Sequence, residues 1–284
     1  MAIALRFKVE NSAQVASKMR SPNLSSCSSL RKNVISRQKV LIGIANLHFF
    51  MISLEQLQQN LAAEYLCCTN LNLYDDSSCS TLATQAAAGR HLQVIGQEAR
   101  AVEVRLCEDD YPGWLLVEDL AFLQVAQRVY QASFVTAAEI QARIPAAVEF
   151  TKLAMQQPNY YLWGGTVGPN YDCSGLMQAA FASVGVWLPR DAYQQEAFCL
   201  AVAVEDLQVG DLVFFGSEHK ATHVGLYLGE CFYIHSSGQK IGRDGIGIDL
   251  LSELGEEVGR SYYRQLRGCG RVVRSYKPRS RSVA

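Results

Sequence analysis

The chain of 284 residues has no marked excess of either charge, because its 26 lysines and arginines nearly balance its 27 aspartates and glutamates. A net charge of −1 does not favour nucleic acid or a membrane surface as a partner. The apolar run over residues 40–52 is shorter than the ~20 residues that a transmembrane helix needs. With 49% apolar residues, the composition predicts a globular protein of one large domain or two ordinary ones.

The nine cysteines lack the spacing of a disulfide framework. Cys67 and Cys68 are adjacent, the others are irregularly spaced, and a chain of this length does not need stapling. No two cysteines show the C-x-x-C spacing of a zinc site, so we expect no metal and no cofactor. A reducing compartment fits this pattern, which favours a cytoplasmic location over a periplasmic or secreted one.

Residues 1–52 differ from the rest, with eight basic residues, one acidic residue and a serine-rich patch over 21–29. A secretory signal fits poorly, because the leader is long and no A-x-A cleavage site follows, while an organelle transit peptide stays open. We expect a disordered extension, or a wrongly chosen start with Met51 as the working start. Ser53 follows closely and could cap a helix.

Residues 53–131 contain short segments that predict strands. Residues 101–106 alternate apolar and charged side chains, as a half-buried strand does. Turn residues separate such segments at a spacing typical of a small antiparallel barrel. Residues 132–145 predict a linker, in which a capping box from Thr136 to Glu139 is soon followed by Pro145.

Residues 146–276 predict an α+β domain, since helical segments come first and strands follow. A basic tail over 277–284 is expected to fray. Within this domain, Cys173 stands at the start of a predicted helix, where backbone N–H groups and the helix dipole favour the thiolate. A cysteine nucleophile needs a base, and the base needs an orienting partner. His223 and His235, both in predicted strands, supply that set.

Four motifs in this order resemble the NlpC-type cell-wall cysteine peptidases, a papain-like family. They are Y-x-W-G-G from Tyr161, D-C-S-G from Asp172, H-V-G-L-Y from His223 and I-H-S from Ile234. Residues 113–115, Gly-Trp-Leu, resemble a segment of bacterial SH3-type domains. The resemblance implies a small SH3-like β-barrel followed by a papain-like peptidase domain with an antiparallel sheet. The chain looks similar to the γ-D-glutamyl-L-diamino acid endopeptidases of murein peptide recycling.

The resemblance also implies roles for the catalytic residues. Cys173 would attack the scissile carbonyl, His223 would act as general base, and His235 would orient His223. The oxyanion would be bound by the backbone N–H of Cys173 and by the Tyr161 hydroxyl. Tyr161 could equally be a half-buried aromatic whose hydroxyl is hydrogen-bonded elsewhere.

A substrate pocket follows from the same resemblance. In the related subgroup, the aspartate before the nucleophile binds the α-amine of an N-terminal L-Ala, helped by a tyrosine of the barrel. Arg190 would pair with the α-carboxylate of D-Glu. The chain departs from the pattern at Ala192, where related pockets often carry serine. The implied substrate-binding residues are Tyr111, Asp172, Ser174, Arg190 and Asp191.

We therefore expect hydrolysis of the γ-D-Glu–diamino acid bond in free murein peptides of the form L-Ala-γ-D-Glu-diamino acid. One alternative is a secreted peptidoglycan hydrolase whose SH3-type barrel binds the wall. Another is amide or acyl transfer on a lipid or small molecule, for which an anchoring apolar segment is expected near the site; none follows Ile52. Neither the diamino acid nor the oligomeric state follows from the sequence.

Overall fold

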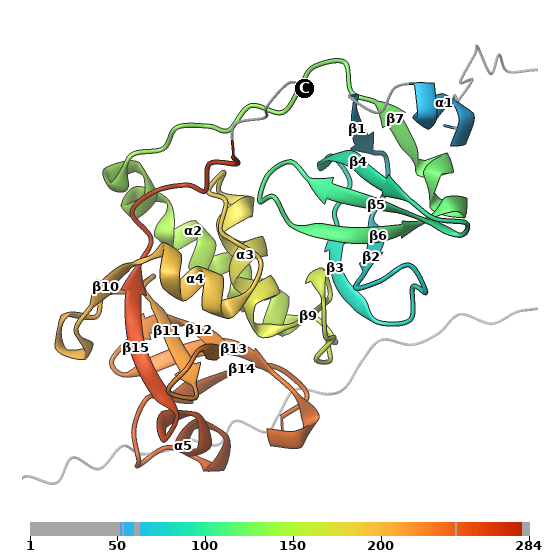
Figure 1. Cartoon of the computed structure of the whole chain (residues 1–284). Coiled ribbons are helices and arrows are strands. Elements are labelled where there is room, and N and C mark those ends of the chain that lie inside the picture. The colour runs from blue at the N-terminus through green and yellow to red at the C-terminus, as the bar shows by residue number, and fades with distance from the viewer. Residues whose placement is uncertain (1–51, 53, 60–62, 242, 280–284) are drawn as a thin grey trace, which may run out of the picture. The chain divides into compact units, whose positions relative to one another are not determined.

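The computed structural model describes residues 52, 54–59, 63–241 and 243–279 (Figure 1). The expectations for residues 1–51 and for the last five residues of the tail therefore lie outside the described part of the chain. No helix among the described residues combines the length and the apolar character needed to cross a membrane.

The first domain is an SH3-like barrel built from one seven-stranded sheet in the order β3-β2-β6-β5-β4-β1-β7. All of its paired strands are antiparallel. Burial alternates along β5, where Val102 and Val104 are inside and Arg105 is exposed, as the sequence pattern predicts. Its elements are α1 (Leu54–Gln59), β1 (Glu64–Cys67), β2 (Leu71–Tyr74), β3 (Leu82–Ala86), β4 (His91–Gln97), β5 (Ala101–Leu106), β6 (Pro112–Leu116), the 3-10 helix η1 (Val117–Phe122) and β7 (Leu123–Val125).

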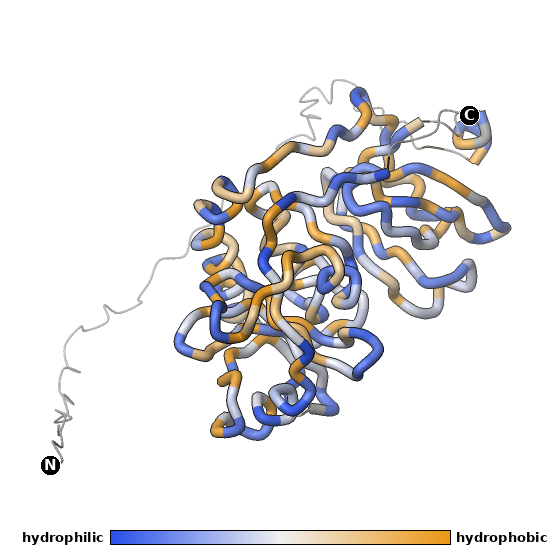
Figure 2. The backbone as a smooth tube through the Cα atoms, turned by 60° about the vertical axis from the view of Figure 1, so that its left-hand side comes forward, coloured by the Kyte–Doolittle hydropathy of each residue, from blue (hydrophilic) through white to orange (hydrophobic). Residues whose placement is uncertain are grey.

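The second domain is built around a six-stranded antiparallel sheet in the order β10-β15-β11-β12-β13-β14. The expected α+β class is thus confirmed. Apolar segments fill its strands and helices, and hydrophilic residues gather at its turns (Figure 2). The strands are β10 (Leu200–Val202), β11 (Leu212–Gly216), β12 (Ala221–Gly229), β13 (Phe232–Ser237), β14 (Gly245–Leu250) and β15 (Leu266–Arg271), with a small hairpin of β8 (Thr166–Val167) and β9 (Asn170–Tyr171) before them.

Helices cover both faces of this sheet. Leu212 and Phe214 of β11 point to one face and share a core with residues of α2, α3 and α4. Val213 and Phe215 point to the other face and pack with Tyr262 of α5. The helices are α2 (Ala137–Gln156), α3 (Cys173–Ser183), α4 (Ala192–Phe198) and α5 (Glu257–Tyr263), with single 3-10 turns at η2 (Val204–Asp206) and η3 (Gln239–Ile241).

The predicted linker over 132–145 is wrong from residue 137 onward, because α2 begins there and continues through Pro145 to Gln156. Proline inside a helix costs about 3 kcal/mol, since it removes a hydrogen bond and crowds the preceding turn. Here Pro145 is exposed, and Ile144 and Val148 on either side of it are buried in the core. Packing of the apolar face therefore outweighs the local preference of proline to end the helix. The predicted capping box at Thr136 and Glu139 is present and begins this helix.

Hydrogen bonds join the barrel to the second domain. Thr84 of β3 accepts a hydrogen bond from Arg190 Nε at 2.9 Å. The Gln85 carbonyl accepts one from the Thr166 hydroxyl at 2.8 Å, and Asp109 accepts one from Gln178 at 2.8 Å. These bonds place the edge of the barrel beside the start of α3, where the predicted nucleophile lies.

Candidate active site

The start of α3 is built by a close turn and a capping carboxylate. Asp172 is the N-cap residue, and its Oδ1 accepts the Gly175 N–H at 2.6 Å. A Cβ on Gly175 would lie 2.0 Å from the carbonyl oxygen of Gly165, so only glycine permits this approach. Gly164 has φ +78, a left-handed conformation that glycine adopts without strain. These constraints hold Cys173 as the first residue of the helix.

The Cys173 thiol is 5% exposed and lies beside the beginning of β12. Burial, and after it the neighbouring Asp172 carboxylate, raise its pKa to about 12. The backbone N–H groups of Val224 and Ser174 donate to the sulfur and act in the opposite direction. Desolvation thus outweighs the helix-start effect that the sequence favours, and the resting group is a neutral thiol at pH 7.

The two predicted histidines form a relay that continues to a carboxylate. His223 Nε2 lies 2.6 Å from His235 Nδ1, and His235 Nε2 lies 2.7 Å from Asp249 Oδ2. Arg243 donates to both oxygens of Asp249 at 2.7 Å. His235 is fully buried, so its two ring nitrogens have no competing water. The order of groups is therefore Arg243, Asp249, His235 and His223.

The relay determines the protonation of each ring. Since an ionised Asp249 can only accept, His235 Nε2 carries a proton and His235 Nδ1 is left as an acceptor. His223 Nε2 must then donate to it, which leaves His223 Nδ1 as the basic nitrogen. Among the described residues, no hydrogen-bond partner is found for that Nδ1. Burial lowers the pKa of His223 well below its usual value and also lowers that of His235, so both rings are neutral near pH 7.

Three members of this assembly, Arg243, Asp249 and Tyr262, were not found by reasoning from the sequence. Asp249 pairs across the sheet with Tyr233, two residues before His235, so strand register brings it to the ring. Tyr262 of α5 stacks on the His223 ring, with centroids 4.0 Å apart and planes 17° apart, and meets the His235 ring edge-on. An aspartate in the otherwise apolar strand over 245–250 was the available signal for Asp249; Tyr262 has none.

A cavity of about 320 Å³ opens beside the thiol. It is lined by Cys173 and by every residue that the sequence assigned to substrate or oxyanion binding, whereas His223 and His235 are not among its lining residues. Barrel residues contribute part of its wall. The lining residues are Asp75, Ala83, Tyr111, Tyr161, Trp163, Asp172, Cys173, Ser174, Arg190, Asp191, Ala192, Tyr193, Lys220, Ala221 and Thr222.

Asp172 and Arg190 use most of their hydrogen-bonding capacity on each other. Arg190 Nη1 and Nη2 donate to the two Asp172 oxygens at 3.1 and 2.5 Å, and Nη1 also donates to Ser174 Oγ at 2.9 Å. Asp172 further accepts the N–H groups of Gly164 and Gly175. Arg190 is 2% exposed. The expected pairing of Asp172 with a substrate amine, and of Arg190 with a substrate carboxylate, does not fit this saturated pair.

Asp191 and Asp75 are the cavity carboxylates outside the Asp172–Arg190 pair. The Tyr111 hydroxyl of the barrel donates to Asp191 Oδ1 at a long 3.4 Å. Burial raises the pKa of Asp191, and the Arg190 guanidinium opposes that shift. A cationic group placed between Asp191 and Tyr111 would gain a charge-assisted hydrogen bond and would stabilise the ionised carboxylate.

Tyr161 lies close enough to Cys173 for the charge of the thiolate to affect the pKa of the Tyr161 hydroxyl. Its pKa is raised, chiefly by burial and next by the charge of an ionised Cys173. The hydroxyl therefore stays protonated at neutral pH and can donate. A Cβ on Gly238 would lie 3.6 Å from the ring, and the Tyr161 N–H donates to Asp244 at 3.1 Å. This geometry is compatible with the oxyanion role and keeps the ring in place.

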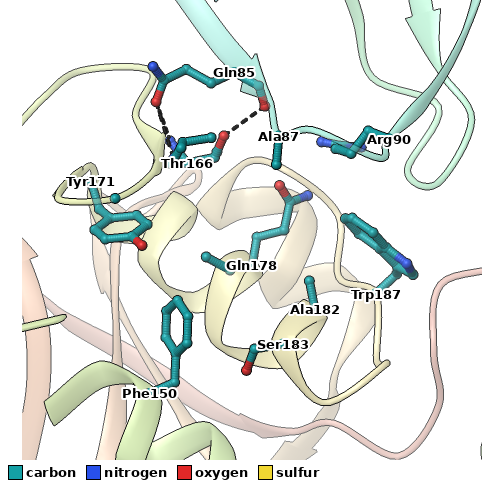
Figure 3. Close-up of a pocket in the computed structure, with 13 residues that line it drawn as sticks. Gln85, Ala87, Arg90, Phe150, Thr166, Tyr171, Gln178, Ala182, Ser183 and Trp187 are labelled. Atoms are coloured by element: carbon teal, nitrogen blue, oxygen red, sulfur yellow. Dashed lines mark hydrogen bonds between the residues drawn. The ribbon is translucent and has the colours of Figure 1, made fainter. Parts of the chain in front are cut away.

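A second cavity, of about 280 Å³, borders the later turns of α3 (Figure 3). The rings of Phe150, Tyr171 and Trp187 edge it, and Gln178 extends along it from the helix. None of the described residues that line it is a cysteine, a histidine or a carboxylate. Across the described chain, no group of three or more histidine, cysteine, aspartate or glutamate side chains is placed to hold a metal ion.

Two family models match this chain, and each matches one of the two domains seen in the structure. Residues 60–120 match the family described as Bacterial dipeptidyl-peptidase Sh3 domain, and residues 158–264 match the NlpC/P60 family. Residues 158–264 are an NlpC/P60 domain. The match spans the helix that carries Cys173 and the strands that carry both histidines, so the family resemblance of the four sequence motifs is confirmed.

Similar curated proteins include two that are named gamma-D-glutamyl-L-lysine dipeptidyl-peptidase. A gamma-D-glutamyl-L-lysine dipeptidyl-peptidase of Bacillus subtilis is 43% identical over 95 residues, 32% of this chain and 30% of the relative. The protein of that name from Bacillus cereus is 43% identical over 109 residues, 36% of this chain and 32% of the relative. The chain thus matches about a third of the length of these relatives.

Solved structures of the NlpC/P60 fold are also similar. A crystal structure of an NlpC/P60 family protein from Bacillus cereus shares 21% identity, with 78% of this chain and 67% of that chain covered and a TM-score of 0.42. The peptidoglycan hydrolase RipB of Mycobacterium tuberculosis shares 23% identity, with 50% and 70% covered and a TM-score of 0.40.

Proposed function

We propose that the protein is a cysteine peptidase that hydrolyses the γ-D-glutamyl–diamino acid bond of murein peptides with a free N-terminal L-Ala. The observation that carries the proposal is that Val224, the residue after His223, donates its backbone N–H to the Cys173 sulfur. The nucleophile therefore lies beside the strand that begins the relay of His223, His235 and Asp249. Such an arrangement provides nucleophile, base and orienting groups for acyl transfer. The names of the curated relatives support the bond and the dipeptide product, over the third of their length that matches.

The reaction begins from the neutral pair. His223 Nδ1 takes the thiol proton as Cys173 Sγ attacks the γ-carbonyl carbon of D-Glu, because a thiol with a pKa raised to about 12 is not ionised beforehand. The oxyanion accepts from the Cys173 backbone N–H and the Tyr161 hydroxyl. The imidazolium, stabilised by His235 and Asp249, then protonates the departing amine of the diamino acid. A water molecule, deprotonated by His223, cleaves the thioester and releases L-Ala-γ-D-Glu.

Selection of a free N-terminus is assigned to Asp191 and Tyr111 in place of Asp172. The α-amine of L-Ala would sit between the Asp191 carboxylate and the Tyr111 hydroxyl, which are 3.4 Å apart at their nearest oxygens and would separate to admit it. Because Tyr111 comes from the barrel, the barrel closes the cavity at the end that receives the N-terminus. Asp172, Ser174 and Arg190 shape the start of α3 and the cavity wall.

The test is mass spectrometry of products from L-Ala-γ-D-Glu-diaminopimelate and L-Ala-γ-D-Glu-L-Lys, each with a free and an acetylated N-terminus. The free peptides should release L-Ala-γ-D-Glu, and acetylation should slow release at least tenfold. Equal rates on free and acetylated peptides would overturn the amine selection. Release from intact sacculi at a comparable rate would favour the alternative of a wall hydrolase. Turnover by Cys173→Ala would remove the nucleophile assignment.

A further inference from the structure

The catalytic cavity is lined by two cationic side chains, and they differ in how many hydrogen bonds and ion pairs they form with other residues. Arg190 is buried, and its three guanidinium nitrogens donate to Thr84, Asp172 and Ser174. A substrate carboxylate could reach Arg190 only by breaking this buried network, which is costly. Lys220, in contrast, is exposed, and no ion pair joins it to any carboxylate of the described residues. Lys220 is therefore the cation in the lining that is available to a ligand.

Lys220 is held near the reacting groups by its place in the fold. It is the last residue of the turn between β11 and β12 and stands three positions before His223. The turn is tight, since a Cβ on Gly216 would lie 2.5 Å from the Lys220 carbonyl oxygen. The Lys220 ammonium lies 5.3 Å from the centroid of the Tyr193 ring, and Tyr193 also lines the cavity. The cation–π contact directs the side chain along the mouth of the cavity without neutralising it.

The cavity thus presents charges of both signs to a substrate. Asp191 lies close enough to Lys220 to feel its charge, yet the two form no salt bridge. In L-Ala-γ-D-Glu-diamino acid, the scissile bond uses the γ-carboxyl, so the D-Glu residue keeps a free α-carboxylate. The peptide therefore carries an ammonium at its N-terminus and a carboxylate beside the bond that is cut.

We propose that Lys220 binds the free α-carboxylate of the D-Glu residue and makes the enzyme selective for this acid over its α-amide, D-isoglutamine. The proposal rests on the proposed function, because it names a contact of the same substrate in the same site. The ammonium would form a charge-assisted hydrogen bond with the carboxylate near the wide end of the cavity. The neutral carboxamide would keep the shape of the substrate and lose the charge.

The experiment measures kcat and KM for two peptides that differ only at this group, L-Ala-γ-D-Glu-L-Lys and L-Ala-D-isoglutaminyl-L-Lys. The wild-type protein should prefer the carboxylate about tenfold in kcat/KM, mainly through KM, and less at high salt. Lys220→Met should reduce the preference to within about twofold, and Lys220→Glu should invert it. Lys152→Met, a partly exposed lysine of α2 outside the cavity, is the matched control and should keep the wild-type preference.

The outcomes separate the two proposals. If Lys220→Met keeps the tenfold preference, or if the wild-type protein cleaves both peptides equally, the role of Lys220 is wrong while the proposed hydrolysis stands. If the wild-type protein cleaves neither peptide, the proposed function itself fails. A thermal melt of each variant, read by circular dichroism, checks that the exposed substitution leaves the fold unchanged.

Discussion

Helix α3 borders two cavities of similar volume, about 320 Å³ at its start and about 280 Å³ along its later turns. The first is lined by three aspartates, an arginine, a lysine and the thiol of Cys173. The second is lined mainly by aromatic and small side chains, with neither a carboxylate nor a histidine among its described lining residues. Volume alone therefore does not distinguish a reaction site; the difference lies in the thiol and the carboxylates of the first cavity, because Arg90 is the one charged side chain among the described residues that line the second.

The largest expected difference between the two cavities comes from removing the nucleophile. Cys173→Ala should lower kcat/KM for L-Ala-γ-D-Glu-L-Lys by at least ~10⁴, because no other group in the first cavity can form the thioester. Ser183→Ala, in the lining of the second cavity, should leave kcat/KM within about twofold. Dipeptide release is measured by mass spectrometry. A comparable loss of kcat/KM in both variants would contradict the assignment of the reaction to the first cavity alone.

The protonation state of the thiol can be tested by alkylation. Because burial raises the pKa of Cys173 to about 12, the thiolate fraction should rise about tenfold per pH unit between pH 6 and 9. The rate of iodoacetamide labelling at the Cys173 peptide, followed by mass spectrometry, should rise with it. A rate that is flat over this range would indicate a preformed thiolate–imidazolium pair instead. Cys107, which is buried outside both cavities, serves as an internal comparison.

Asp249 lies outside both cavities and should still influence the first. Asp249→Asn can present an N–H to His235, which would reverse the proton order of the relay and remove the basic nitrogen of His223. We expect kcat to fall about a hundredfold with KM changed by less than about threefold. Steady-state kinetics on the free peptide measure both. A loss confined to KM would contradict the relay.

Tyr111 tests the part of the first cavity that comes from the barrel. Tyr111→Phe removes the hydroxyl that donates to Asp191 and keeps the ring. The value of kcat/KM should fall about tenfold for the peptide with a free N-terminus, and less for its acetylated form. An equal fall for both would show that the hydroxyl supports the structure and not the amine.

The smallest effect on activity is expected in the second cavity. Phe150→Ala removes one of the rings that edge it, and Phe150 is partly buried against the core. The free energy of unfolding should fall by about 2 kcal/mol, less than the ~3–5 kcal/mol of a fully buried phenylalanine. Urea denaturation measures the loss, and kcat should stay within about twofold. A large fall in kcat would give the second cavity a part in the reaction.

Reasoning from the sequence found the site residues that belong to short local motifs. Cys173, His223 and His235 each stand in a motif with its own turn or strand, and the structure brings Cys173 together with Tyr111 and Asp191 at one cavity. Asp249 and Tyr262 could not be predicted, because their contacts depend on the register between β13 and β14 and on where α5 packs. Long-range pairing of this kind leaves no periodic signal in the chain.

The misread residues have a physical reason in common. Asp172 and Arg190 were expected to bind substrate because the resemblance to the related subgroup implies it, whereas here they are buried and hydrogen-bond each other. Pro145 was taken as the end of a linker, yet it lies inside α2, whose buried residues on both sides hold the helix together. In each case tertiary packing decided what local chemistry could not.

The hydrogen bond from Arg190 to Thr84 joins the barrel to the side chain that pairs with Asp172, the residue that caps the catalytic helix. Replacing the barrel with another SH3-type domain would therefore have to keep a hydroxyl at position 84. Without it, Arg190 would lose the hydrogen bond that helps to hold Asp172 at the start of the catalytic helix. In engineering terms, the two domains are one working part, and their border is a poor place to cut and rejoin the gene.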